Sequence, residues 1–155
     1  MEIDFGYWLS VANEAMKDEA MHRWAAETLA VWLRAGCCCA YCKVDLLLTR
    51  DAAYFGQQTD HILPKSRYPN LKKSFSNLTL ACTACNRLKL GWYPNKENAV
   101  FDGAATELTP PQREEAIRRT QLFLAEKRRP LEAEFLAELA VIRPLLGKRA
   151  AVRVT

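Results

Sequence analysis

The chain has 155 residues, of which half are hydrophobic and 26% are charged. This composition excludes a disordered or fibrous protein, and no apolar run approaches the roughly 20 residues that a membrane span needs. The net charge of +4 is unevenly spread, because residues 36–100 carry nine basic against four acidic side chains, whereas residues 1–35 carry three against six. The positive charge therefore concentrates in the middle of the chain, as a polyanionic substrate requires.

Residues 5–35 are expected to form one long helix or two shorter ones. Apolar residues such as Trp8 and Ala15 recur there at helical spacing, and Gly36 is a natural stop. Three tryptophans lie in this segment, and we expect them in the core rather than at an interface. His22 has polar neighbours, so we expect it at the surface and assign it no chemistry.

Two Cys-x-x-Cys pairs flank an insert of 39 residues; they are Cys39 with Cys42 and Cys82 with Cys85. Two such knuckles complete a tetrahedral zinc site. Disulfides are the alternative, but we see no secretory signal, and thiols stay reduced in the cytoplasm where we expect this protein. Cys38 is an alternative to Cys39 as the first zinc ligand. The spacing favours Cys39, which leaves Cys37 and Cys38 as packing residues or spare thiols.

Between and around these pairs the pattern predicts a strand, a loop, a second strand and a helix. The strands are residues 57–63 and 78–80, and the helix runs from Thr83 to Leu90, where Gly91 closes it. Upstream, residues 44–49 predict either a strand or a turn of helix. Neighbouring residues on a strand face opposite sides, so the adjacent Asp60 and His61 need not do the same job.

The C-terminal third is expected to be irregular at first and helical afterwards. Residues 92–108 show few periodic positions. Thr109-Pro110-Pro111-Gln112 resembles a capping box that starts a helix, which Pro130 is expected to break near Arg129. A second helix over residues 131–142 is expected to end at Pro144.

The segment from Cys39 to Lys89 resembles the HNH endonuclease family, in its four-cysteine, zinc-braced branch. The resemblance covers about a third of the chain and rests on these motifs: the Asp60-His61 pair, the Asn77-Leu78 step sixteen residues later, and Cys82-x-x-Cys85-Asn86. The chain departs from many relatives in the loop after the histidine. They carry a glycine pair where this chain has Ser66-Arg67-Tyr68-Pro69-Asn70.

The resemblance implies that Asp60 and Asn86 are ligands of a catalytic metal and that His61 is the general base. It also implies that Asn77 holds the loop and orients the histidine. One carboxylate and one amide oxygen favour Mg²⁺ or Mn²⁺ over zinc, and a neutral imidazole suits proton abstraction near pH 7. The alternative for His61 is a structural histidine or a stray zinc ligand, although four thiolates already complete a zinc site. Six basic residues are expected to contact phosphates: Lys65, Arg67, Lys72, Lys73, Arg87 and Lys89.

The sequence thus predicts an α+β fold with a zinc-braced ββα-metal core (37–92). An N-terminal helical segment (1–36) and an irregular linker with C-terminal helices (93–155) flank this core, and we expect the whole chain to form one compact domain. The predicted function is divalent-metal-dependent hydrolysis of phosphodiesters, with DNA as the expected substrate. One alternative is a nuclease subunit whose flanking helices dock a partner protein of a phage-defence or mobile-element system, or a second copy. Another is a non-catalytic, zinc-containing nucleic-acid-binding module, against which the intact Asp60, His61 and Asn86 argue.

Overall fold

The computed structural model describes residues 5–94, 101 and 103–152, with side chains up to residue 145. The chain divides into two compact units, of which unit 1 ends at Gln121 and unit 2 begins at Leu122. Within the described residues, no helix combines the length and the apolar character needed to cross a membrane.

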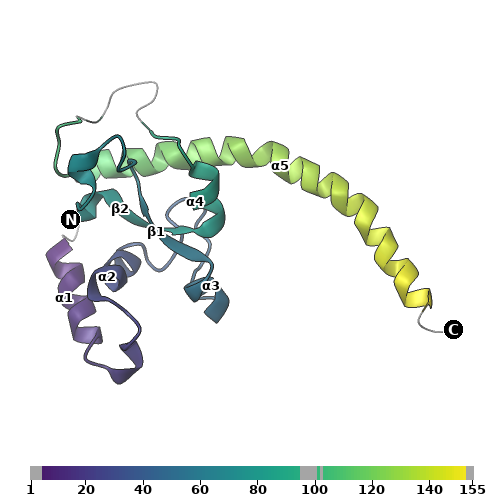
Figure 1. Cartoon of the computed structure of the whole chain (residues 1–155), viewed down its shortest axis with the longest axis horizontal. Coiled ribbons are helices and arrows are strands. Elements are labelled where there is room, and N and C mark those ends of the chain that lie inside the picture. The colour runs from purple at the N-terminus through teal and green to yellow at the C-terminus, as the bar shows by residue number, and fades with distance from the viewer. Residues whose placement is uncertain (1–4, 95–100, 102, 153–155) are drawn as a thin grey trace. The chain divides into compact units, whose positions relative to one another are not determined.

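The centre of unit 1 is a two-stranded antiparallel sheet followed by a helix (Figure 1). β1 (Gln57–His61) pairs with β2 (Leu78–Cys82), so that Gln57 lies opposite Cys82 and His61 opposite Leu78. α4 (Thr83–Lys89) follows β2 directly. The predicted order of strand, loop, strand and helix is therefore confirmed, and so is the mixed α and β fold class.

Two local signals set the length of α4. At its start, the Cys82 sulfur accepts a hydrogen bond from the Cys85 backbone N–H at 3.3 Å and so acts as the N-cap. At its end, Gly91 has a φ of +74°, a left-handed conformation that glycine adopts without a steric penalty. The Trp92 N–H then donates to the Lys89 carbonyl at 2.8 Å. The helix therefore ends at Lys89, one residue before the predicted Leu90.

The N-terminal segment forms two helices rather than one. They are α1 (Phe5–Ala15) and α2 (Ala26–Arg34), separated by a short 3-10 turn at Glu19–Met21. Their apolar faces pack on each other, and the indole rings of Trp24 and Trp32 meet edge to face with centroids 5.0 Å apart. Trp32 is 1% exposed, which confirms a core role for this residue.

The segments on either side of the sheet are largely irregular. Residues 44–49 form neither the expected strand nor a turn of helix, because their only regular contact is an isolated bridge between Asp45 and Cys38. α3 (Arg50–Tyr54) follows, and the Thr49 hydroxyl caps it by accepting from the Ala52 N–H at 3.0 Å. The described residues of the 92–108 segment contain no helix and no strand, as predicted. Residues 95–100 and 102 of that segment lie outside the described residues.

The C-terminal helix differs from the prediction. α5 (Pro110–Val152) is continuous and contains both Pro130 and Pro144, so the expected break at Pro130 and end at Pro144 are wrong. A proline removes one backbone donor and crowds one carbonyl, at a cost of about 3 kcal/mol. The flanking positions are mostly alanine, leucine, glutamate, lysine and arginine, which are strong helix formers and continue the helix on both sides. The predicted start is confirmed, because the Gln112 side chain accepts from the Thr109 N–H at 2.9 Å.

The loop between β1 and β2 is held by a buried asparagine. Asn77 is fully buried, and its side-chain oxygen accepts from the Leu63 N–H at 2.8 Å. Its amide nitrogen donates to the Leu63 carbonyl at 2.9 Å and to the Leu71 carbonyl at 3.4 Å. Leu63 and Leu71 belong to the hydrophobic cluster beneath the loop. One side chain therefore satisfies the polar backbone groups that this turn of the chain buries.

Replacing Asn77 with alanine is expected to lower the free energy of unfolding by about 2–5 kcal/mol, because it leaves the N–H and the carbonyl of Leu63 buried without this partner. Urea unfolding of the zinc-loaded protein measures this change. Asn70→Ala is the matched control, because Asn70 is exposed and its contacts with the 103–104 backbone are long, at 3.4 and 3.5 Å. Equal losses in the two variants would contradict the role of Asn77.

Candidate functional site

Four cysteine sulfurs gather at one end of the sheet, all within 4.8 Å of one another; they belong to Cys39, Cys42, Cys82 and Cys85. Zinc–sulfur bonds of 2.3 Å in a tetrahedron place the sulfurs about 3.8 Å apart. The Cys42 and Cys82 sulfurs lie at 3.7 Å. Cys37 and Cys38 are outside the cluster, so the choice of Cys39 over Cys38 as the partner of Cys42 is confirmed. The cluster is compatible with a structural zinc ion.

The chemistry of these thiols fits a divalent cation. Hydrogen bonds from the Cys82 and Cys85 thiols hold the pKa of the Cys39 thiol well below its usual value. The hydrogen bond to Cys39, more than burial, raises the pKa of Cys82 to about 11. Several negative charges in so small a volume repel one another, whereas a bound zinc ion deprotonates the thiols that coordinate it and balances their charge.

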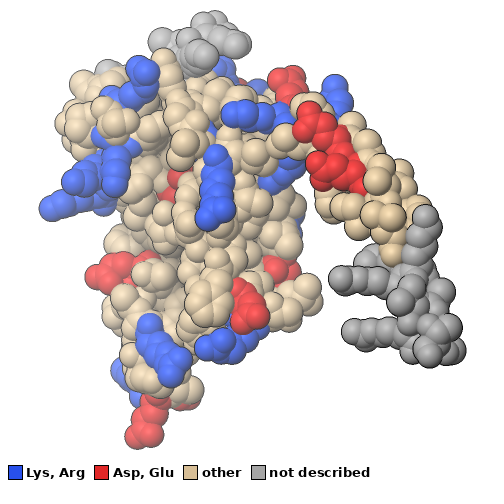
Figure 2. Space-filling model, turned by 45° about the vertical axis from the view of Figure 1, so that its right-hand side comes forward, with Lys and Arg blue, Asp and Glu red and all other residues tan. Residues whose placement is uncertain are grey.

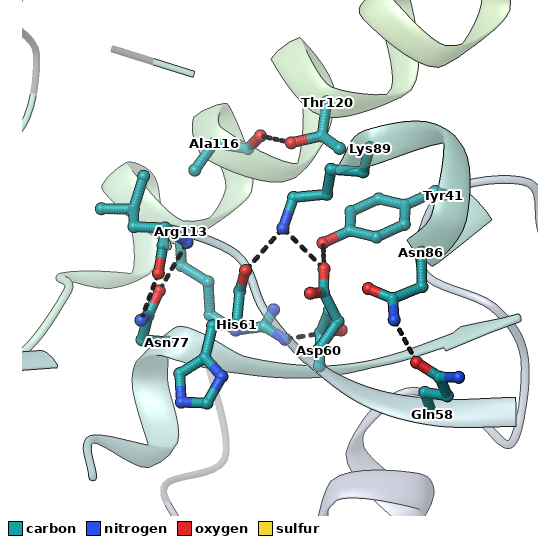
Figure 3. Close-up of polar contacts among 12 residues, drawn as sticks. Tyr41, Gln58, Asp60, His61, Asn77, Asn86, Lys89, Arg113, Ala116 and Thr120 are labelled. Atoms are coloured by element: carbon teal, nitrogen blue, oxygen red, sulfur yellow. Dashed lines mark hydrogen bonds and ion pairs between the residues drawn. The ribbon is translucent and has the colours of Figure 1, made fainter. Parts of the chain in front are cut away.

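Asp60 lies near the end of β1 and is held by two donors from other parts of unit 1 (Figure 3). The Tyr41 hydroxyl donates to Asp60 Oδ2 at 2.5 Å, and Lys89 Nζ donates to the same oxygen at 2.7 Å. The Asp60 and Lys89 side chains are 11% and 6% exposed. Burial raises the pKa of Tyr41, with Asp60 adding to the effect. Burial lowers the pKa of Lys89, which the Asp60 carboxylate opposes.

His61, the next residue, is oriented by the loop that follows it. Its Nε2 lies 2.9 Å from the Lys72 carbonyl oxygen. A carbonyl only accepts hydrogen bonds, so Nε2 carries the hydrogen and Nδ1 of the neutral ring carries the lone pair. In Figure 3 the ring points away from the Asp60 carboxylate, as expected for neighbours on one strand.

Asn86 lies in the first turns of α4 and contacts the same face of β1 as Asp60. Its Nδ2 donates to the Gln58 side-chain oxygen (Figure 3). Gln58 precedes Asp60 by two residues, which places both on one face of the strand. This contact fixes the amide so that Asn86 Oδ1 is the atom left for a ligand.

An open pocket of about 270 Å³ brings these groups together. Its wall includes Asp60, His61, Lys65, Asn86 and Lys89. Asn77 is fully buried and does not line this pocket. The pocket therefore combines a proton acceptor (His61), two side chains with oxygen atoms that can bind a metal (Asp60 and Asn86) and two lysines (Lys65 and Lys89). β1, α4 and the loop after β1 supply these residues.

Residues 39–90 match the family model described as HNH endonuclease. The match spans the cysteine cluster, both strands and α4, and it confirms the resemblance found in the sequence. A domain of this family indicates nuclease activity in general and a nucleic-acid substrate. No curated protein and no solved structure matches the chain.

The basic residues of the HNH segment take two kinds of position. Five of the six that were expected to contact phosphates are exposed: Lys65, Arg67, Lys72, Lys73 and Arg87. Figure 2 shows basic side chains spread over the visible face rather than joined in one patch. Lys89 differs from that expectation, because it is 5% exposed and its ammonium is bound to Asp60. A buried lysine needs such a partner, and here the partner is a predicted metal ligand.

Sequence reasoning did not single out two residues of the HNH site. Gln58 could have been found, because a polar side chain two positions before Asp60 shares its face of the strand. Tyr41 gave no signal of its own. Its contact with Asp60 arises only when the first cysteine knuckle folds against β1, 19 residues away in sequence.

Replacing Cys82 with serine is expected to abolish zinc binding and most of the folded protein. The binding free energy of structural zinc, about 10–16 kcal/mol in zinc-finger peptides, is part of the folding free energy. Zinc content measured by native mass spectrometry, together with circular dichroism, tests this.

Cys38→Ser is the matched control, since its thiol lies outside the cluster, and it should retain one zinc ion per chain. Well-folded wild-type protein without zinc would refute the assignment.

Proposed function

We propose that this protein is a divalent-metal-dependent endonuclease that hydrolyses phosphodiester bonds in DNA. The observation that carries the proposal is that His61, Asp60 and Asn86 line one pocket, and each has a polar side-chain atom to which the described residues make no hydrogen bond. Lys72 holds His61, and Gln58 holds Asn86. Tyr41 and Lys89 together hold Asp60. A site whose side chains are held by other contacts is preorganised for catalysis.

His61 serves as the general base in this proposal. Its Nδ1 takes a proton from water as the water oxygen attacks the phosphorus. The bond from phosphorus to the leaving oxygen breaks, and that oxygen keeps the electron pair and takes a proton from solvent water. The Lys72 carbonyl keeps the tautomer in which Nδ1 is basic and also stabilises the imidazolium that forms. A histidine is suited to this step because its pKa lies close to neutral pH.

Asp60 Oδ1 and Asn86 Oδ1 would hold a Mg²⁺ or Mn²⁺ ion. Both are hard oxygen donors, and the pocket is open enough to keep several waters on the ion, as magnesium sites require. When bound, the ion supplies Lewis-acid stabilisation of the charge that develops on the phosphate. It would be distinct from a zinc ion in the cysteine cluster, whose role would be structural.

A nuclease subunit that docks a partner protein is a second candidate function. Unit 2 favours it, because residues 131–145 of α5 carry large apolar side chains that are 46–67% exposed, among them Phe135, Leu136 and Val141. Leu131, Phe135 and Ile142 follow at steps of four and seven residues and so share one face of the helix, and an exposed apolar face is typical of an interaction site. Mass measurement of the native particle distinguishes a lone chain from an assembly.

His61→Ala is expected to lower the rate of plasmid cleavage in Mg²⁺ by roughly 10²–10⁴, the usual contribution of a positioned general base. Zinc content and DNA affinity should not change, because no zinc ligand is removed. Asn86→Ala should lose comparable activity and regain part of it at high Mn²⁺, whereas no metal concentration should restore His61→Ala.

His22→Ala is the control, since His22 is exposed and lies outside the HNH segment. Wild-type cleavage by His61→Ala would refute the base assignment. Loss of zinc and fold in that variant would show that His61 is structural.

Neutralising Lys72 and Lys73 together should make the plot of log binding constant against log salt concentration less steep. The expected decrease in slope corresponds to roughly two phosphate contacts, because each contact releases condensed counterions. Changing Lys72 to glutamine leaves the backbone carbonyl that contacts His61. Fluorescence anisotropy of the Lys72→Gln/Lys73→Gln variant over a salt series measures the slope. The Lys17→Gln/Arg23→Gln pair, exposed on the N-terminal helical segment, should keep the wild-type slope. If the first pair also keeps it, the DNA-binding surface lies elsewhere.

A further inference from the structure

The carboxylate proposed as a metal ligand already has a cation on one of its oxygens. Lys89 Nζ lies 2.7 Å from Asp60 Oδ2 and also donates to the His61 carbonyl at 2.5 Å. Its side chain is 6% exposed, and it projects from the last turn of α4. Because a backbone carbonyl as well as the carboxylate binds it, the ammonium is fixed beside Asp60 and is not a mobile surface charge.

The second partner of Oδ2 completes the orientation of the carboxylate. The Tyr41 hydroxyl donates to Oδ2 at 2.5 Å from the first cysteine knuckle. With both donors on one oxygen, the other oxygen, Oδ1, is the one available for a ligand in the pocket. Tyr41 contributes a dipole, whereas Lys89 contributes a full positive charge, so the two contacts have different electrostatic consequences.

The side chains around the proposed metal position consequently carry no net negative charge before a metal binds. The charges of Asp60 and Lys89 cancel, Asn86 is neutral, and the lysine at the pocket rim, Lys65, adds positive charge. A divalent ion on Oδ1 would lie within a few ångströms of the Lys89 ammonium. Like charges at this separation repel strongly, even with partial screening by solvent. A phosphodiester in the pocket would add the negative charge that the protein itself does not supply.

We propose that Lys89 is a positioning residue that holds Asp60 in place and keeps the affinity of the free protein for Mg²⁺ or Mn²⁺ low until a substrate phosphate enters. This inference rests on the proposed function, since it concerns the same pocket. Binding linkage is reciprocal, so the metal strengthens nucleic-acid binding by the same factor as nucleic acid strengthens metal binding.

A purely structural ion pair would behave differently. Breaking a buried pair destabilises the fold, and a loosened Asp60 would bind metal no better than before. The proposal instead requires that metal affinity increase when the charge of Lys89 is removed. Removing the charge of Lys89 must strengthen metal binding in the absence of nucleic acid, even where it weakens the fold.

The test is a titration of zinc-loaded protein with Mn²⁺ alone, followed by electron paramagnetic resonance of the free ion. Lys89→Gln removes the charge and retains an amide donor, so it should bind Mn²⁺ roughly tenfold more tightly than the wild type. Lys89→Arg retains the charge and should stay within about twofold of the wild type. Tyr41→Phe removes one donor without changing the charge and should not tighten binding.

Asp60→Asn separates this inference from the proposed function. If Asp60→Asn binds Mn²⁺ as the wild type does, the metal site is wrong and both proposals are overturned. If Asp60→Asn loses binding while Lys89→Gln binds no more tightly than the wild type, only the role of Lys89 is overturned.

A second measurement covers the case in which Lys89→Gln does not fold. In the His61→Ala background, which is expected not to cleave, a DNA oligonucleotide should tighten Mn²⁺ binding by roughly tenfold or more. The same titration with Asp60→Asn added corrects for Mn²⁺ bound to the DNA itself. No change on adding DNA would overturn the proposal.

Discussion

The contact between the two cysteine pairs determines where most of the site lies. Cys82 is the last residue of β2 and the N-cap of α4, so one residue sets both the end of the sheet and the start of the helix. Asn86 and Lys89 then follow within the first two turns of α4. The other pair has Tyr41 between its two cysteines, which carries the phenol to Asp60. A cluster with no part in the proposed chemistry thereby positions three groups around one carboxylate.

His61 depends on a different constraint, the loop between the strands. The buried Asn77 ties the start of that loop to its end, and the Lys72 carbonyl within the loop orients the imidazole. The proposed base, His61, and the proposed metal ligand, Asp60, are therefore held by separate sets of contacts, although they are adjacent in sequence. In a unit with a small core, such local devices provide a rigidity that extensive packing provides in larger enzymes.

What the sequence predicts well here is what short-range signals determine. The strand patterns and the glycine at 91 are local signals, so β1, β2 and α4 were placed within about two residues. The cysteine spacing predicted the cluster and its register. Lys89 was harder, because its position in the last turn of a helix is equally typical of a phosphate contact. Only the location of Asp60, 29 residues away, accounts for its burial. The break predicted at Pro130 was wrong because a local signal was given too much weight. The neighbouring residues continue the helix despite the cost of a proline inside it.

The distribution of charge separates attraction of the substrate from chemistry at the pocket. In the pocket, the charge of Asp60 is balanced by Lys89, so we expect exposed residues such as Lys72 and Arg87 to attract a polyanion. Exposed charges are screened over about 8 Å at physiological ionic strength, whereas a buried pair at 2.7 Å is screened much less. Added salt should therefore weaken nucleic-acid binding while the arrangement around Asp60 stays intact. The buried ion pair thus preserves the geometry of the site under conditions in which the protein and its substrate dissociate.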